Sequence, residues 1–575
     1  MKPSEQTRFD SLLEWSENHG GKLHPSLEIY NDNVTKYSLR VKPSIADALQ
    51  PGFSAVTCPA ATTLSYLNAL VDGPINHQPA DSPSNSPTAA FPPGFTQSLP
   101  PHVLGRFFLI KEYLKGKDSL WWPYLATLPS PDQISAWVLP PFWPYDEIRY
   151  LEGTNAHVAI QEIQANVKGE FKQARKLLKA ENFPDVAAYT NLMYKWAFCI
   201  FTSRSFRPSL ILSDATKQHV STLLPEGVEL DDFSILQPVL DIANHSPTAR
   251  YSWDTTSPAD ACTLICRDRY APGAQIFNNY GLKTNSELLL GYGFILPPTP
   301  DLHNDYVHVR KTTSHRTSPS PDPNQDQDQD PGSNVVSPSR SPTTNNNATN
   351  PLLPQTFLVS LRPIAHPSSV VSWARPRRPP SDQSPSSTET DGHDTSTSTS
   401  TSTGTSTSTS RGLALLPCFA HFEPALLCDL ATTLAAPEQV RLADRWLREV
   451  EMGQVRVGGV AMTEAEAEEA ARPPGEVARV VQTVREALEE KMRFDYGVVM
   501  ELGLGREEDV RWQEADLARM PGMAEFHDSL LPPRTGNQRL AVQYRRQYAK
   551  VLEAAMESLA GEDWGTSAVW SAMSE

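Results

Sequence analysis

The sequence predicts an α+β protein in which a region of short strands lies between two mainly helical regions. From about 101 to 202, apolar residues recur every three or four positions, the spacing of amphipathic helices. From 239 to 309 the pattern changes to short apolar runs separated by Asn-His, Pro-Gly and Tyr-Gly breaks, which favours short strands and tight turns. Helical spacing returns from 413 to 575.

Three apolar faces mark individual helices. Two in the first region consist of Ile160, Ile163, Val167, Phe171, Ala174 and Leu178, and of Tyr189, Leu192, Met193, Trp196 and Ile200. A third, near the C-terminus, consists of Leu540, Tyr544, Tyr548, Val551, Leu552 and Met556. Residues three and four apart lie on one side of a helix, so each set predicts a face that packs on a core.

Two segments have compositions that do not suit a packed core. Residues 312–412 consist mainly of Ser, Thr, Pro, Asn and Asp, and they bury too little apolar surface to offset the entropy lost on ordering. We therefore predict a disordered linker there, with one short strand at 357–361, where apolar residues alternate. A second Pro- and Ser-rich stretch, 72–101, predicts a surface loop.

The charge of the chain limits its partners. Lys+Arg 50 against Asp+Glu 67 gives a formal charge of -17, whereas phosphate binding needs a basic surface, so we expect no direct nucleic-acid partner. Residues 413–575 contain 28 acidic and 17 basic side chains and so carry -11 of this charge. An acidic surface can steer a basic protein toward it, although a solvated helix face explains the same count.

Cysteine usage and hydropathy predict an intracellular protein. The six cysteines are scattered along a long chain, which is typical of a reducing compartment. The first residues lack the apolar core of a secretion signal, and no run of about 18 apolar residues occurs. We expect a cytoplasmic and/or nuclear monomer with no membrane partner. Because Cys262 and Cys266 have no second pair at zinc-site spacing, we also expect no metal.

Motif searches exclude some chemistries and favour one family. The sequence has no GxxxxGK[ST] loop, no GxGxxG after a strand and no HExxH. Four ordered blocks are informative instead: WAFCIFTSRSF at 196–206, LDIANHSP at 240–247, APGAQIFNNYG at 271–281 and NSELLLGYGF at 285–294. The last three resemble the signature blocks of SET-domain protein methyltransferases, and the first resembles a block of the Rubisco large-subunit lysine methyltransferase subgroup.

The resemblance extends over about residues 10–310. FFLIKE at 107–112, WPYL at 122–125, LP at 128–129 and LEGT at 151–154 look like the helical insertion of that subgroup. The resemblance implies a SET domain over 1–311 with a knot-like active site, its helical insertion at about 101–202, the linker at 312–412 and a helical substrate-binding domain over 413–575. It implies a protein-lysine N-methyltransferase that uses S-adenosylmethionine and acts on a basic protein, such as a ribosomal protein or a histone.

Methyl transfer of this kind is an in-line displacement, which depends on positioning more than on acid–base groups. By position, Tyr280 matches the active-site tyrosine of the family and Tyr292 a second tyrosine of the lysine channel, so both are predicted catalytic residues. The predicted cofactor-binding residues are Ser203, Arg204, Asp241, Asn244, His245, Phe294 and Tyr280 itself. Tyr251 is a further candidate for the channel wall. Taken singly, these side chains would be interpreted as packed core, turn or surface residues, and only their order favours a site.

One departure from the family pattern lies near the N-terminus. Family members begin the domain with a Gly-x-Gly turn whose backbone approaches the cofactor, because glycine tolerates close approach and unusual backbone angles. The corresponding stretch here, 33–41, contains no glycine, and Lys36 to Leu39 would make these contacts. Without this turn, an inactive SET-fold module that binds peptides stays open as an alternative. A protein-histidine methyltransferase is a second alternative, because a related SET subgroup methylates histidine.

Overall fold

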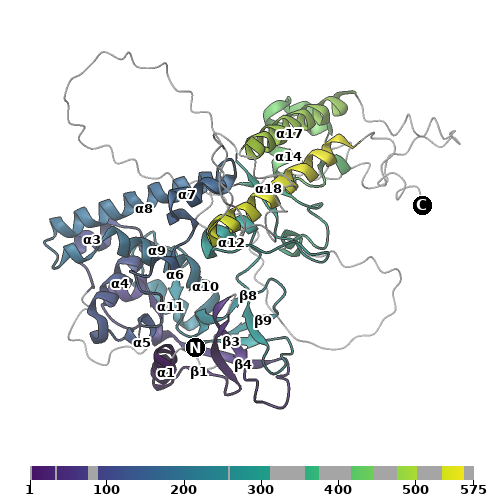
Figure 1. The fold of residues 1–575 in the computed structure, drawn as a ribbon. Helices are drawn as coiled ribbons and strands as arrows, with labels where there is room; N and C mark the ends of the chain where they lie inside the picture. The colour runs from purple at the N-terminus through teal and green to yellow at the C-terminus, as the bar shows by residue number, and fades with distance from the viewer. Residues whose placement is uncertain are drawn as a thin grey trace, which may run out of the picture.

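The computed structural model describes residues 3–32, 35–75, 89–256, 260–310, 356–374, 413, 416–443, 475–501 and 534–561. Its buried apolar side chains form two clusters, one around the N-terminal strands and the helices next to them, and one around the C-terminal helices. Strands and helices occupy largely separate parts of the chain (Figure 1), so the predicted α+β class is confirmed.

The first four-stranded sheet has the order β1-β4-β10-β9. Its strands are Lys22–Leu23, Phe53–Pro59, Ala261–Cys266 and Tyr251–Asp254. Helix α1, Pro3–Asn18, packs beside β1 and supplies the buried side chains Phe9, Leu12 and Trp15 to the N-terminal core. A small third sheet joins β5 (Leu64–Ser65), β7 (Ile235–Leu236) and β6 (Ser205–Phe206).

The second four-stranded sheet, in the order β2-β3-β11-β8, contains the segment that positions the site. Its strands are Leu27–Asp32, Lys36–Val41, Gln275–Asn278 and Asn244–His245. The first half of β11 pairs antiparallel with β3, and its second half pairs in parallel with β8, with Phe277 opposite Asn244 and Asn278 opposite His245. The Asn-His segment and the segment leading to Tyr280 therefore lie side by side.

The helical region between 101 and 202 is as predicted in its main features. Helix α8, Asn155–Ala180, buries every residue of the first predicted apolar face, and α9, Asn191–Arg204, contains most of the second. Leu192 was placed on that face, but its side chain is exposed. The remaining helices here are α4 (Pro101–Lys115), α5 (Trp122–Leu125), α6 (Ile134–Trp137) and α7 (Tyr145–Ile148).

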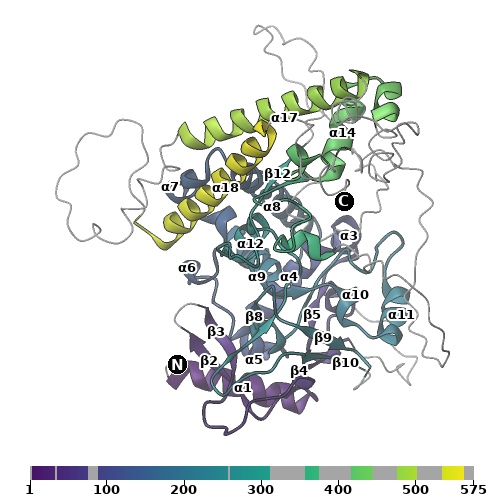
Figure 2. The same cartoon turned by 90° about the vertical axis from the view of Figure 1, so that its right-hand side faces the viewer.

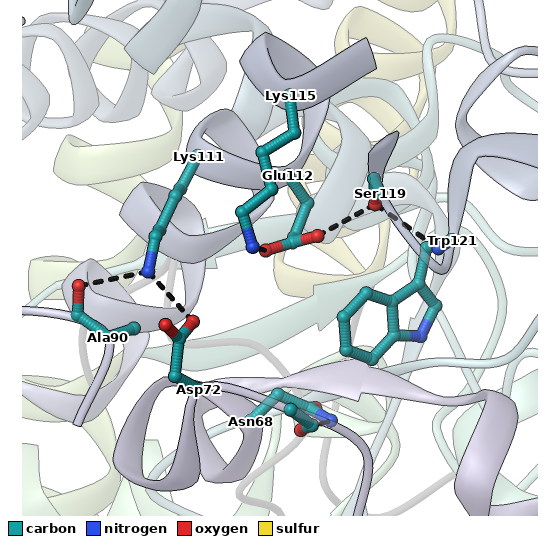
Figure 3. Close-up of polar contacts among 9 residues, drawn as sticks. Asn68, Asp72, Ala90, Lys111, Glu112, Lys115, Ser119 and Trp121 are labelled. Carbon is teal, nitrogen blue, oxygen red and sulfur yellow. Dashed lines mark hydrogen bonds and ion pairs between the residues drawn. The ribbon is translucent and has the colours of Figure 1, made fainter. Parts of the chain in front are cut away.

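Buried polar contacts connect α4 to the start of α5 (Figure 3) and attach that start to the chain after β4. Glu112 of α4 is almost fully buried and accepts hydrogen bonds from Lys115 and from the hydroxyl of Ser119, which in turn accepts one from the backbone N–H of Trp121. The Trp121 indole N–H donates to the carbonyls of Thr62 and Thr63, each at 3.1 Å, in the 3-10 turn between β4 and β5. A buried carboxylate needs such partners, so these contacts fix the start of α5 against the sheet.

Two predicted elements of the N-terminal half are corrected. The stretch 72–101 is not only a surface loop: Phe91 and Phe95 are buried and the latter belongs to α3, Pro93–Ser98, while 76–88 lies outside the described residues. The region 239–309 contains a helix, α12, Asn285–Tyr292. Its run of three leucines resembles a buried strand, but a capping box of Thr284 and Glu287 starts a helix there. Helices α2 (Tyr66–Val71), α10 (Pro208–Ile211) and α11 (Asp214–Leu223) complete this half.

The strand predicted within the linker is confirmed and corrects the linker itself. Strand β13, Phe357–Ser360, pairs antiparallel with β12, Tyr306–Val309, and Val359 is fully buried in the C-terminal core. Residues 356–374 are thus part of the folded protein, because β13 completes a sheet and contributes apolar surface. The rest of the predicted linker lies outside the described residues.

The C-terminal region is helical. Helices α14 (Pro424–Leu434), α17 (Gly475–Glu501) and α18 (Gly536–Ala560) are described, and α18 packs on α17 and on β12 and β13 (Figure 2). The predicted α18 face is confirmed, with Tyr544, Tyr548, Val551 and Leu552 buried. Among the described residues, no helix is long and apolar enough to cross a membrane.

Candidate functional site

Four predicted site residues form one aromatic cluster. The rings of His245 and Tyr280 stack with their centroids 5.0 Å apart, and the rings of Tyr280 and Tyr292 stack at 4.8 Å. Phe294 lies 6.3 Å from both His245 and Tyr292. Gly293, with φ 76°, ends α12 in the left-handed conformation that glycine adopts readily. The chain therefore turns between the rings of Tyr292 and Phe294.

Backbone contacts fix the orientation of two of these rings. The backbone N–H of Tyr280 donates to Nδ1 of His245 at 3.0 Å, and the Tyr280 hydroxyl donates to the carbonyl of Ala243 at 3.1 Å. Since Nδ1 accepts, the imidazole proton is on Nε2, which is buried and has no hydrogen-bond partner within the described ranges. Burial, with the nearby positive charge of Lys283, lowers the pKa of His245 to about 4, so the ring is neutral near pH 7.

Both tyrosines keep their protons. Burial raises the pKa of Tyr280 above its ordinary value of 10.0, and the neighbouring Tyr292 adds to the effect. Burial likewise raises the pKa of Tyr292 to about 12. Neither hydroxyl can serve as a general base near neutral pH, because neither is ionised there. The cluster offers instead apolar ring faces and neutral hydroxyl groups in fixed positions.

An ion pair lies next to the aromatic cluster. Arg204, at the end of α9, donates to Asp241 Oδ2 at 3.2 Å, and the hydroxyl of Tyr124 donates to the same oxygen at 2.9 Å. Asp241 lies two residues before Ala243, whose carbonyl accepts the hydrogen bond from Tyr280, so the pair lies near Tyr280. Asp241 Oδ1 is buried and has no partner in the part of the chain that is described. Burial raises the pKa of Asp241, and Arg204 and Tyr124 only partly offset this.

Asn244 lies next to His245 on β8, at the point where the backbone pairing of β11 changes from β3 to β8, called the partner switch below. Its side-chain Nδ2 donates to the hydroxyl of Ser38 on β3 at 2.5 Å. Ser38 is fully buried, and its hydroxyl also shares a hydrogen bond of 2.8 Å with the hydroxyl of Thr35. The amide of Asn244 is therefore anchored to β3, although β3 and β8 do not pair through their backbones.

Two predicted residues are not brought into this cluster by their side chains. The Ser203 hydroxyl donates back to the carbonyl of Cys199 at 2.8 Å within α9. Tyr251 lies on β9, in the other four-stranded sheet, where the centroid of its ring is 5.3 Å from that of Trp253. The channel-wall role of Tyr251 stays a prediction that these contacts do not support.

Three side chains at the site were not predicted. Tyr124 belongs to the WPYL segment, which the sequence marks as a block without giving it a role. Ser38 lies in the stretch without glycine, and Lys283 is buried beside Glu287, with Nζ 3.7 Å from Oε1. Tyr124 and Ser38 carried a signal in the sequence, because the first lies in a family block and the second within Lys36 to Leu39, which was expected to contact the cofactor.

The arrangement suits a polar, partly aromatic ligand better than a metal. In the described ranges, no group of three or more His, Cys, Asp or Glu side chains could hold a metal ion. In the same ranges, Nε2 of His245 and Oδ1 of Asp241 are buried polar atoms without hydrogen-bond partners, and the His245 ring stacks on Tyr280. These features fit S-adenosylmethionine, which combines an aromatic base, a charged amino-acid part and a sulfonium centre.

Sequence comparison gives relatives for about half of the chain. The "Ribosomal lysine N-methyltransferase set10" of Schizosaccharomyces pombe is 28% identical over 294 residues, covering 51% of this chain and 46% of that protein. The "Protein-lysine N-methyltransferase EFM1" of Saccharomyces cerevisiae is 22% identical over 324 residues, covering 50% of each chain. The chain is related to SET-domain protein-lysine methyltransferases. The expected family resemblance is thereby confirmed.

A third relative, from a vertebrate, is also named as a lysine methyltransferase. The "N-lysine methyltransferase SETD6" of Bos taurus is 24% identical over 308 residues, covering 53% of this chain and 60% of that protein. A solved structure of Rubisco LSMT bound to AdoMet aligns over 97% of this chain and 92% of its own, with 14% identity and a TM-score of 0.49. No protein-family model matches the chain. The chain spans about half the length of the relatives named here.

Proposed function

We propose that this chain is an S-adenosylmethionine-dependent protein-lysine N-methyltransferase. The observation that carries the proposal is the parallel pairing of β8 with β11, which places Tyr280 against His245 and Tyr292 in one buried cluster. Residues that are 35 and 12 positions from Tyr280 in the sequence meet there in the order that the family blocks require. The names of the related proteins support the same activity.

The cofactor would be held by the residues predicted for it. Asn244, His245 and Phe294 offer an amide, a buried imidazole N–H and a ring face, and the Arg204–Asp241 pair lies beside them. When bound, S-adenosylmethionine supplies an activated methyl group. Ser203 would contribute through its backbone, since its hydroxyl is engaged within α9.

The site's own residues would act by positioning and desolvation. The Tyr280 hydroxyl stays protonated and donates a hydrogen bond to the Ala243 carbonyl. Its oxygen lone pairs remain to accept hydrogen bonds from an incoming amine. A lysine amine is protonated in water near pH 7, and burial beside the Tyr280 and Tyr292 rings favours its neutral, nucleophilic form. Holding the amine in line with a methyl group supplies much of the rate enhancement in such a displacement.

We propose a basic protein as the substrate, with a ribosomal protein as the first candidate. The net charge of -17, most of it beyond residue 412, favours a basic partner. The S. pombe relative is named as a ribosomal lysine methyltransferase, which supports this choice. The helices of 413–575 would form the substrate-binding domain, and 1–311 the SET domain. The six cysteines are free, which supports a cytoplasmic and/or nuclear location.

Two measurements test the activity. Calorimetric titration of the full chain with S-adenosylmethionine should give saturable binding, and incubation with labelled cofactor and ribosomal proteins should label lysine, as read by mass spectrometry. Tyr280→Phe should lower turnover by at least about tenfold while leaving cofactor affinity nearly unchanged, because it removes a hydrogen bond made at the reacting centre.

Tyr113→Phe is the matched control, because it removes a tyrosine hydroxyl on α4, outside the aromatic cluster. It should leave turnover unchanged. Absence of cofactor binding up to millimolar concentration would support the peptide-binding module instead. Label found on histidine would support the protein-histidine methyltransferase.

A further inference from the structure

The start of β3 is built without the glycines expected there. Lys36 adopts φ 61°, the left-handed conformation that side chains other than glycine rarely take. Thr35, just before it, donates its backbone N–H to the Asp32 carboxylate at 2.8 Å, which closes the turn. Asp32 and Lys36 are opposite each other in the pairing of β2 with β3, so this side-chain hydrogen bond fixes the end of the two strands.

The turn places a chain of polar side chains at the partner switch of β11. The amide of Gln275 donates to the Thr35 hydroxyl at 3.1 Å, the Thr35 and Ser38 hydroxyls are 2.8 Å apart, and Asn244 donates to Ser38 at 2.5 Å. Three strands, β3, β11 and β8, contribute to this chain. It connects them where backbone pairing passes from one partner to the next.

Burial makes the hydrogen bond between Asn244 and Ser38 costly to lose. Ser38 is fully buried, so water does not replace a lost partner there, and a buried polar group without one is costly. An amide carries two N–H donors and one carbonyl oxygen. With one N–H of Asn244 bound to Ser38, the amide plane is fixed, and its remaining N–H and its oxygen are available to a ligand.

We propose that Ser38 is a positioning residue of the cofactor site, which orients the Asn244 amide through its hydroxyl. This inference rests on the proposed function, since Asn244 matters here as a cofactor-binding residue. Ser38 acts through Asn244 and need not touch the ligand. A hydroxyl thus provides order at a point where the chain lacks the expected glycine turn.

A double-mutant cycle in the full chain tests the proposal. S-adenosylhomocysteine binding is measured by calorimetry for the wild type, Ser38→Ala, Asn244→Ala and the double variant. Ser38→Ala should weaken binding about fivefold to tenfold, the usual effect of one hydrogen bond with a buried partner. The double variant should bind no more weakly than Asn244→Ala alone, because Ser38 has no effect without the amide it holds.

Thr57→Val is the matched control. Its hydroxyl pairs with that of Thr263 at 3.0 Å between β4 and β10, in the other sheet, and its loss should lower the melting temperature without changing the dissociation constant. If Ser38→Ala does not fold, Thr35→Val removes the outer partner of Ser38 and should weaken binding about twofold to threefold. Equal losses from Ser38→Ala in the presence and absence of the Asn244 amide would overturn the proposal.

The failure of this proposal can be told apart from failure of the proposed function. If the wild type does not bind S-adenosylhomocysteine, the methyltransferase proposal itself fails. If the wild type binds and the folded Ser38→Ala or Thr35→Val variants keep its dissociation constant, only the role of Ser38 is refuted.

Discussion

Replacing Tyr124 by Phe removes one hydrogen-bond donor from a buried carboxylate. The Tyr124 hydroxyl donates to Asp241 Oδ2 at 2.9 Å, and Asp241 Oδ1 already lacks a partner among the described residues. A hydrogen bond to a charged group contributes about 1.5 to 3 kcal/mol, whereas one between neutral groups contributes about 0.5 to 1.5 kcal/mol. We expect Tyr124→Phe to destabilise the fold by about 2 kcal/mol at neutral pH.

The loss of stability caused by Tyr124→Phe should grow as the pH rises. Burial raises the folded-state pKa of Asp241 above its ordinary value of 3.8, so the folded state binds this proton more tightly than the unfolded state. Stability therefore falls as the pH rises from about 3.8 through the folded-state pKa. Tyr124→Phe removes a donor to the ionised carboxyl and so raises that pKa further. The loss of stability should therefore be smallest at the acidic end of the range and largest at neutral pH.

Urea unfolding of the wild type and of Tyr124→Phe at several pH values between 4 and 8 measures the difference in their free energies of unfolding. Tyr194→Phe is a suitable control, because its hydroxyl also donates to a carboxylate, Glu170, at 2.8 Å. The partners of Glu170 lower its pKa to about 2 despite burial, so Glu170 stays ionised over the whole range and this control should lose a constant amount. A loss from Tyr124→Phe that is the same at every pH would refute the reasoning.

Three further changes test other parts of the structure. Lys36→Gly should raise the free energy of unfolding by about 0.5 to 1 kcal/mol, measured by urea unfolding, because Lys36 holds φ 61°. Thr284→Ala should lower stability by about 1 kcal/mol in the same assay, because it removes the capping box of α12. Arg545→Ala should lower the melting temperature by several degrees, because the fully buried guanidinium donates to the carbonyls of Val499 and Glu152. An unchanged value in any assay would contradict the corresponding contact.

Periodicity predicted the long helices, and the family resemblance predicted the residues of the aromatic cluster, but neither predicted the contacts that Tyr124 and Ser38 make beside it. The face of α8 from Ile160 to Leu178 repeats at helical spacing, so periodicity alone predicts its burial. The leucines of α12 are buried on all sides and show no such period, so that helix was missed. The contacts of Tyr124 with Asp241 and of Ser38 with Asn244 join residues 117 and 206 positions apart, and no local pattern contains that information.

The site depends on the helical insertion as much as on the sheets. Trp121 donates to the carbonyls of Thr62 and Thr63, between β4 and β5, and Tyr124, one turn later, donates to Asp241 just before β8. Both donors lie on the same short segment, which therefore contacts the β4–β5 connection and also Asp241, the partner of Arg204 of α9. The insertion must therefore be folded before Asp241 has its partners. A carboxylate buried without them would carry a large free-energy cost, so insertion and site should unfold as one unit.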